Sequence, residues 1–352
     1  MKTSKKVTVG ALTVGGGAPI TVQSMLNVDT HNFDAVYEQT KALENEGCDI
    51  VRLAVPDIDA VESVRKLKES DIHVPIVADI HFDYKIALAC AAAGIDKIRI
   101  NPGNIGSKAK VAEVVAACKD GGIPIRIGVN GGSLRREILE KYGSPTAEAL
   151  AESAMEHVHI LEELNFDNII VSIKSSDVRT MIKANRILRE ACDYPLHIGV
   201  TEAGSAHIGT LKSAVGIGSL LCDGIGDTIR VSLTASPLLE VKEGKALLSA
   251  LGLGGASLVD VVSCPTCGRT KIDLIELSER FEKDILPTLK PSRRIKVALM
   301  GCAVNGPGEA READIGIAGG EGEALLFKKG VTVGKYGEDV ILDVLRDEIN
   351  KM

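Results

Sequence analysis

Three cysteines near the C-terminus have the types and spacing of metal ligands. Cys264 and Cys267 form a C-x-x-C pair in SCPTCGRTK, and Cys302 follows in GCAVNGPGEA. Thiolates grouped in this way bind zinc or iron–sulfur clusters, and both centres commonly have four protein ligands. The sequence therefore has to provide a fourth ligand or leave one coordination position open.

The missing fourth thiolate or imidazole argues against structural zinc. Such sites prefer four cysteines, or three cysteines and a histidine, but the last histidine of the chain is His207 and no cysteine follows Cys302. An iron–sulfur cluster held by three thiolates and one oxygen ligand fits better. The best local oxygen donor is Glu309, just after the turn NGPG; an exposed glutamate with no metal role is the alternative for this residue.

A second set of chemically active residues follows the Val/Ile-rich segments of the first 233 residues. VRLAV, KIRIN, PIRIGVN, VSIKSS and TIRVSL each carry a cation among aliphatic residues with a period of two. In a closed barrel the aliphatic face must meet the helices, so the polar face points inward. This inward set comprises Arg52, Arg99, Asn101, Arg126, Asn130, Ser172, Lys174, Arg230 and Ser232.

These inward cations predict an anionic ligand. Unpaired charges in a barrel interior are costly, and Asp79 and Glu202 are the obvious inward carboxylates. The surplus positive charge favours a phosphate or diphosphate, which suits arginine forks. Pairing with loop carboxylates that merely hold the barrel together is the alternative. Asp79, His81 and Glu202, at neighbouring strand ends, are candidate acid–base groups, although His81 alone is often a structural residue.

The elements that must position these residues repeat along the chain. Val/Ile-rich strand segments alternate with amphipathic or Ala-rich helical segments, which predicts parallel βαβ units. Eight units predict a (β/α)₈ TIM-type barrel, with a doubly wound open sheet as the alternative, although no G-x-G-x-x-G opens the first helix. A hairpin in residues 5–18 is expected to cover the barrel floor. The strand segments are residues 20–25, 49–55, 75–81, 97–101, 124–130, 169–175, 196–202 and 228–233.

After a last barrel helix over 237–251, the pattern changes. GLGGAS (252–257) is typical of a linker, so we expect a barrel domain over 1–252 and a small α+β iron–sulfur domain over 258–352. In this second domain we expect a charged helix over 272–286. The strands RIKVALMGC, ADIGIAGG, EALLFKKG and VTVGKYG and the closing helix EDVILDVLRDEINK follow.

Composition excludes several classes of function. A net charge of −7 gives no basic field for nucleic acid, and 3% aromatics with no Trp argues against base stacking. No stretch approaches the length of a membrane span, and the N-terminus has no apolar signal core, so a cytoplasmic location is expected. In a reducing cytosol, clustered thiols indicate metal or catalysis, and the five scattered cysteines are interpreted as buried hydrophobes.

Together the motifs resemble the bacterial two-domain 4-hydroxy-3-methylbut-2-enyl diphosphate synthase family of the non-mevalonate isoprenoid pathway. The resemblance runs over the whole chain, through VQSM, ADIHFD, RINPGN, RIGVNGGSL, SIKSS, GVTEAG, CPTCGR and GCAVNGPGE. It implies a TIM-type barrel followed by a [4Fe–4S] domain, with the cluster on Cys264, Cys267, Cys302 and Glu309. It also implies a homodimer in which one subunit's cluster domain caps the other's barrel.

The resemblance further implies a reaction and a set of site residues. The family reductively opens 2-C-methyl-D-erythritol 2,4-cyclodiphosphate and removes water, using two electrons from reduced flavodoxin or ferredoxin. Asp79, His81 and Glu202 match its polar active-site positions, and Glu202 is our hypothesised proton donor. Its diphosphate-binding positions correspond to Arg52, Arg99, Asn101, Arg126, Asn130, Lys174, Arg230 and Ser232.

Two other functions compete on the residues alone. A non-redox aldolase or transferase barrel with a structural metal domain would contain zinc. An electron carrier with the barrel as a docking scaffold would have a redox centre but no affinity for diphosphates. The barrel cations argue against the carrier, and the missing fourth Cys or His argues against zinc.

Overall fold

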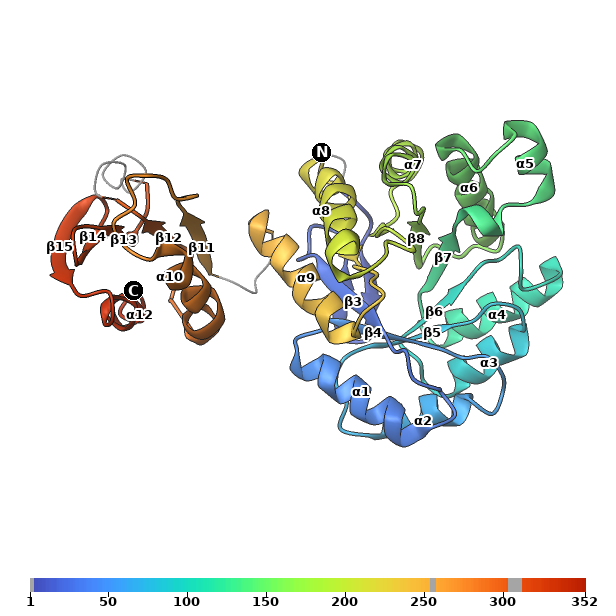
Figure 1. Ribbon diagram of the computed structural model, residues 1–352. Coiled ribbons are helices and arrows are strands. Elements are labelled where there is room, and N and C mark those ends of the chain that lie inside the picture. Colours follow the sequence, from blue (N-terminus) through green and yellow to red (C-terminus); the bar gives the residue numbers. More distant parts are fainter. Residues whose placement is uncertain (1–2, 254–257, 303–311) are drawn as a thin grey trace. The chain divides into compact units, whose positions relative to one another are not determined.

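The computed structural model describes residues 3–253, 258–302 and 312–352 (Figure 1). The chain divides into two compact units, residues 1–254 and residues 255–352. Each unit has its own hydrophobic core.

The first unit is a parallel eight-stranded barrel, as the alternating pattern predicts. Its strands pair in the order β8-β7-β6-β5-β4-β3-β10-β9, and a parallel bridge between Val171 and Leu196 joins the two ends of this sheet. This closure rules out the doubly wound open sheet. The strands are β3 (Thr21–Met25), β4 (Ile50–Ala54), β5 (Ile76–Asp79), β6 (Lys97–Ile100), β7 (Ile125–Val129), β8 (Ile169–Ile173), β9 (His197–Ile198) and β10 (Thr228–Ile229).

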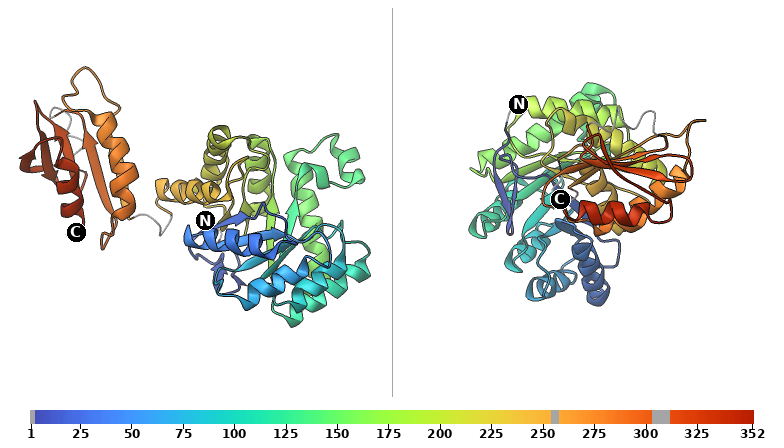
Figure 2. Two further views of the ribbon diagram at one scale, coloured as in Figure 1. Left: turned by 60° about the horizontal axis from the view of Figure 1, so that its bottom comes forward. Right: turned by 90° about the vertical axis from the view of Figure 1, so that its left-hand side faces the viewer.

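Helices surround the barrel (Figures 1 and 2). Their apolar residues pack with those of the strands in one core. Several helices begin at side-chain caps: Asp83, Thr146 and Asp177 each accept a hydrogen bond from a first-turn amide. The helices are α1 (Phe33–Asn45), α2 (Val61–Glu69), α3 (Tyr84–Ala92), α4 (Lys108–Asp120), α5 (Arg136–Tyr142), α6 (Ala147–Glu163), α7 (Val178–Ala191), α8 (Ala206–Cys222) and α9 (Pro237–Ala250).

The N-terminal hairpin closes the bottom of the barrel. Strands β1 (Val7–Val9) and β2 (Leu12–Val14) pair antiparallel. Their apolar face forms one cluster with the first inward residues of three barrel strands, Ile50, Val77 and Ile170. The predicted floor is confirmed, and it is apolar.

The last two barrel strands are shorter than the sequence predicts. Over 196–202 and 228–233, the regular strands cover only His197–Ile198 and Thr228–Ile229, next to the single bridge at Leu196. Beyond these pairs the backbone leaves the regular ladder, and Glu202 adopts a left-handed conformation at φ 51°. Three residues beyond the ladder, Thr201, Arg230 and Ser232, line the pocket described below.

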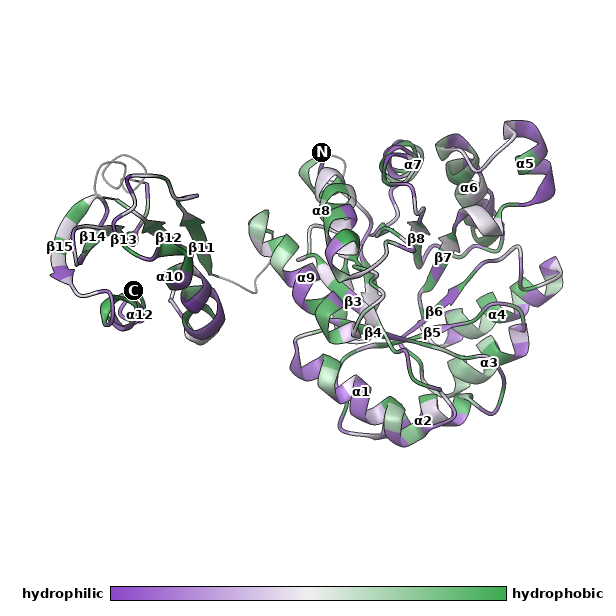
Figure 3. Ribbon diagram, in the orientation of Figure 1, coloured by the Kyte–Doolittle hydropathy of each residue, from purple (hydrophilic) through white to green (hydrophobic). Residues whose placement is uncertain are grey.

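The second unit is a mixed five-stranded sheet of order β11-β12-β13-β14-β15. Strands β11 to β13 are parallel, and β14 and β15 run antiparallel to their neighbours. β11 is hydrophobic, whereas hydrophilic residues colour part of β15 in this unit and much of α5 in the first unit (Figure 3). The elements of the second unit are β11 (Val259–Ser263), α10 (Leu274–Arg280), β12 (Ile295–Met300), β13 (Ile315–Gly319), β14 (Ala324–Lys328), β15 (Val331–Tyr336) and α12 (Ile341–Ile349).

The charged helix expected over 272–286 is not one regular α-helix. After α10 the chain continues as a π turn over Phe281–Ile285 and a 3₁₀ turn over Leu286–Thr288. Pro287 explains the change, because it has no amide hydrogen to donate and its ring clashes with the preceding turn.

Within the described residues, no helix is long and apolar enough to cross a membrane.

Candidate active site

A cationic pocket lies at the carboxyl ends of the barrel strands, where TIM barrels carry their active sites. Its cavity volume is about 100 Å³, and it is partly open to solvent. Seven predicted ligand-binding residues line it: Arg52, Arg99, Arg126, Asn130, Lys174, Arg230 and Ser232. Gly128, Val129, Ser172 and Thr201 complete the lining. The structure thus brings together side chains from β4, β6, β7, β8 and β10 and the segments that follow the strands.

Asp79 is the carboxylate that orders one side of the pocket. It is 1% exposed and accepts hydrogen bonds from Arg52 at 2.5 Å and from Arg99 at 3.1 Å. Burial alone would raise the pKa of Asp79, but the two guanidinium charges outweigh burial and hold that pKa well below its ordinary value. The Asp79 side chain is therefore ionised at neutral pH.

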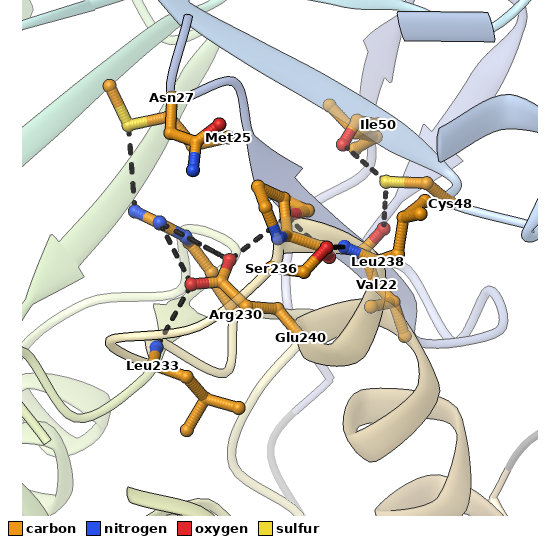
Figure 4. A network of polar contacts seen from close by, with 12 residues as sticks. Val22, Met25, Asn27, Cys48, Ile50, Arg230, Leu233, Ser236, Leu238 and Glu240 are labelled. Carbon is orange, nitrogen blue, oxygen red and sulfur yellow. Dashed lines mark hydrogen bonds and ion pairs between the residues drawn. The ribbon is translucent and has the colours of Figure 1, made fainter. Parts of the chain in front are cut away.

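Glu240 orders the opposite side, and the sequence analysis missed it. It lies in the first turn of α9, 3% exposed, and its carboxylate is 3.3 Å from Nε of Arg230. The same carboxylate accepts hydrogen bonds from the Leu233 amide and the Ser24 hydroxyl (Figure 4). The charged residue between two apolar ones, Leu239 and Val241, was a signal in the sequence. The alternation used to find inward residues applies to strands, however, and not to a helix such as α9. Arg230 is therefore paired by Glu240, whereas we had expected Glu202 as the second inward carboxylate.

His81 and Glu202 lie at the rim rather than inside. Nη1 of Arg99 is 3.1 Å from Nε2 of His81, so the imidazole lies against the guanidinium group. Nε2 of His81 is also 3.8 Å from the Asp79 carboxylate. Glu202 is exposed, and its positive φ is uncommon for a residue with a side chain, which often marks a functional position.

Asn101 is buried just beside the pocket. Its side-chain oxygen accepts a hydrogen bond from the Gly103 amide at 3.0 Å, and its amide nitrogen has no partner in the described part of the chain. Asn101 is not among the residues found to line the pocket. The hydrogen bond from the Gly103 amide to Asn101 orders the loop that follows β6.

Two glycines allow the cations to approach the barrel wall. A Cβ atom on Gly128 would lie 2.7 Å from Nη2 of Arg99, and one on Gly199 would lie 3.2 Å from Nζ of Lys174. Real Cβ atoms essentially never come as close as the first distance. Gly128 therefore leaves room for a guanidinium that a larger residue would displace.

The charges of the pocket do not balance. Five cations line it, and the described carboxylates that pair with them are Asp79 and Glu240. Burial, followed by the charges of Arg230, Arg126 and Arg52, pushes the pKa of Lys174 well below its ordinary value. An anion that enters the pocket would relieve this repulsion, so the site is suited to a phosphate-bearing ligand.

The candidate cluster ligands lie in the second unit. Cys264 directly follows β11, and its amide donates to the Leu299 carbonyl of β12. Cys302 lies just beyond β12 and is buried, whereas Cys267 is exposed. Thr266, between the first two cysteines, has φ 65°, a strained conformation for a β-branched residue that is characteristic of functional loops.

The thiols suit a cluster by residue type and by their place in the chain, although the structure does not gather the three side chains at one point. Two of them follow adjacent parallel strands, and the amides of Arg269 and Lys271 tie the intervening loop to Cys267 and to the Gly301 carbonyl. In the described ranges no three His, Cys, Asp or Glu side chains are close enough together to hold a metal ion. Glu309, the predicted fourth ligand, lies outside the described residues.

The fold and the pocket define a TIM-barrel protein with a cationic pocket at its mouth, joined to a cysteine-bearing α+β unit. Comparisons identify the family. The descriptions "GcpE TIM-barrel domain" and "GcpE protein C-terminal domain" match residues 4–245 and 260–351, respectively. The chain belongs to the GcpE family, which confirms the resemblance recognised in the sequence.

Curated relatives carry the same assignment over their full length. The protein named "4-hydroxy-3-methylbut-2-en-1-yl diphosphate synthase (flavodoxin)" from Clostridium perfringens is 54% identical over 344 residues, 98% of this chain and 97% of that protein. The protein of the same name from Clostridium acetobutylicum is 54% identical over 349 residues, 99% of each chain. Among solved structures, 7,8-dihydropteroate synthase from Vibrio fischeri ES114 covers 71% of this chain with a TM-score of 0.50 at 11% identity, a likeness of fold alone.

Proposed function

We propose that this chain is an iron–sulfur oxidoreductase that converts 2-C-methyl-D-erythritol 2,4-cyclodiphosphate to 4-hydroxy-3-methylbut-2-enyl diphosphate in isoprenoid biosynthesis. The reaction opens the ring reductively and removes water. The observation that carries the proposal is the five-cation pocket at the carboxyl ends of the barrel strands, in a chain of the GcpE family.

The pocket cations would bind the diphosphate group. Arg52, Arg99 and Arg126 approach from consecutive or nearby strands, and Lys174 and Arg230 close the other side. Each charge-assisted hydrogen bond contributes about 1.5–3 kcal/mol. The Asn130, Ser172, Thr201 and Ser232 side chains complete the donor set. Binding energy from the diphosphate would hold the reacting carbon atoms in place.

The three acid–base candidates receive different roles. Asp79 stays ionised beside two guanidinium groups, so we assign it to positioning Arg52 and Arg99 rather than to proton transfer. Glu202 is exposed at the rim, and we propose that it donates the proton to the departing hydroxyl. His81, beside Arg99 at the rim, would orient the substrate.

We propose that Cys264, Cys267, Cys302 and Glu309 hold a [4Fe–4S] cluster. Three thiols on one strand-and-loop framework, with a strained C-x-x-C loop, support the first three ligands. When bound, such a cluster would supply the two electrons one at a time. The proposed electron donor is reduced flavodoxin or ferredoxin. Flavodoxin is the donor given in the names of the relatives.

We further propose a cytoplasmic homodimer in which one subunit's cluster domain caps the partner subunit's barrel. The family resemblance supports this arrangement, and α8 carries an exposed apolar stripe of Ile208, Leu211 and Val215. Sedimentation of the wild-type chain and of Leu211→Glu tests whether this stripe lies in the interface. A wild-type monomer would contradict the dimer.

The test of function is anaerobic purification, metal analysis and assay with the cyclodiphosphate and a reductant. About four irons per chain and turnover are expected. Glu202→Gln should bind the substrate normally but turn over slowly, while Glu163→Gln, a remote exposed change, should behave as wild type. Stoichiometric zinc with no recovery on iron–sulfide reconstitution would contradict the redox function, and normal turnover of Glu202→Gln would contradict its role.

A further inference from the structure

A layer of buried polar side chains lies one step deeper in the barrel than the pocket. Lys97 is two residues before Arg99 on β6, so both point inward. His197 on β9 pairs in register with Thr228 on β10. Lys97 and His197 are both 0% exposed, and Gln23 on β3 is 1% exposed.

The polar atoms of this layer have little to bind. In the described part of the chain, Lys97 Nζ, His197 Nε2 and both amide atoms of Gln23 have no hydrogen-bond partner. His197 makes a contact through its other ring nitrogen, Nδ1, which is 3.3 Å from the Thr228 hydroxyl. Lys97 and Gln23 pair in register with Val77 and Ile50, which belong to the apolar floor formed with the hairpin. Buried unsatisfied groups are costly, so their presence calls for a role.

The charges around Lys97 come from several strands. Burial is the main effect that lowers its pKa well below the ordinary value, followed by Arg126 on β7 and Arg52 on β4. Asp96, its chain neighbour, acts in the opposite direction but is engaged by Lys68 and the Ile76 amide. The pKa of His197 is also lowered well below its ordinary value, by burial first and then by Arg126, with Lys174, Lys97 and Arg52 contributing less.

The cations that repel a proton from Lys97 are also the ones that would bind the ligand. Arg52 and Arg126 line the pocket above it. A bound diphosphate would place negative charge against both guanidinium groups and offset their effect on the layer below. Ligand binding and protonation of Lys97 are therefore coupled through shared neighbours.

We propose that Lys97 is a neutral amine in the ligand-free protein and takes up one proton from solvent when a diphosphate group fills the pocket. The step is the addition of H⁺ to the Nζ lone pair, with no other bond made or broken. It rests on the proposed function only in that the pocket binds a diphosphate. Lys97 is thus a positioning residue that acts through Arg126 and Arg52.

The sign of the linkage follows from the two states. Protonation of Lys97 is easier in the bound state than in the free state, so affinity falls as pH rises between the two pKa values. For one proton, the Kd for diphosphate rises up to about tenfold per pH unit in that window. Outside the window this contribution to the pH dependence disappears.

Titration calorimetry of the full chain with inorganic diphosphate measures the proton directly. At one pH near neutrality, buffers with different ionisation enthalpies give the net number of protons taken up. The wild-type chain and Lys97→Met are compared, with Lys108→Met, an exposed lysine, as the matched control. Protons gained or lost by diphosphate itself cancel in these differences.

We expect Lys97→Met to take up about one proton fewer than the wild type and the control, and its Kd to vary less with pH. Equal uptake in Lys97→Met and wild type would overturn the assignment to Lys97. If Lys97→Met does not fold, the wild type still decides: an uptake that diphosphate ionisation fully explains would overturn the proposal. No binding of diphosphate by the wild type would overturn the anion site itself, which separates failure of the proposed function from failure of this inference.

Discussion

Replacing Asp79 by asparagine would test how far this carboxylate holds the pocket together. The substitution keeps the size of the side chain but removes the charge that faces Arg52 and Arg99. Both guanidinium groups would remain buried, with side chains 11% and 12% exposed, and would repel each other without their shared partner.

The structure sets the size of the effect. Breaking one buried ion pair by removing a partner costs about 3–5 kcal/mol. The asparagine oxygen can still accept a hydrogen bond from one arginine, which favours the low end, so we expect a loss of about 3 kcal/mol in unfolding free energy. Glu163→Gln, which breaks an exposed pair with Lys108, should cost less than about 1 kcal/mol.

The pH dependence provides a second test. Because the folded-state pKa of Asp79 is lowered, its contribution is fully present above the unfolded-state pKa and is lost as pH falls through the folded-state pKa. The difference between wild type and Asp79→Asn should therefore be constant near neutrality and shrink in strong acid. Urea unfolding followed by circular dichroism at several pH values measures both quantities. A neutral-pH difference below about 1 kcal/mol, or one that grows in acid, would refute this account.

Three further changes test other parts of the structure. Glu240→Gln should weaken the hold on Arg230 and raise KM for the cyclodiphosphate more than it lowers kcat; an unchanged KM would contradict that role. Gly128→Ala should displace Arg99 and weaken inorganic diphosphate binding by about tenfold or more in calorimetry, the equivalent of one lost charge-assisted hydrogen bond; unchanged affinity would refute the close approach. Gly218→Ala, within α8 where an added Cβ meets nothing within 4 Å, should raise the unfolding free energy by about 0.5–1 kcal/mol in urea titration; a loss would contradict the space seen there.

The barrel and most of its pocket could be predicted because both depend on local alternation. Arg99 and Arg126 lie among aliphatic residues at a period of two, and the register between β6 and β7 places them directly opposite each other. The number of repeats then fixes which strand ends meet. No long-range information was needed to find these cations.

The carboxylates were harder to assign because their partners are distant in sequence. Glu240 reaches Ser24 on β3 as well as Arg230, and a helical position gives no sign of that contact. Asp79 is an acid–base candidate by residue type, but its two ion pairs show in the structure alone. Which carboxylate meets which cation is decided by the packing of helix on strand, not by periodicity.

The two kinds of buried charge in the barrel have different consequences. Asp79 and Glu240 each fix the guanidinium groups that they contact, which sets the shape of the pocket before a ligand arrives. Arg126 and Lys174 face the same space among other cations, so their repulsion persists until an anion binds. Under the proposed function, relief of that repulsion would favour the bound state at the diphosphate end of the substrate, away from the carbon atoms that react. The ion pairs therefore set the geometry of the pocket, and the unbalanced cations provide its affinity for an anion. A substitution that gives Arg126 or Lys174 a carboxylate partner would be expected to stabilise the fold while weakening the site.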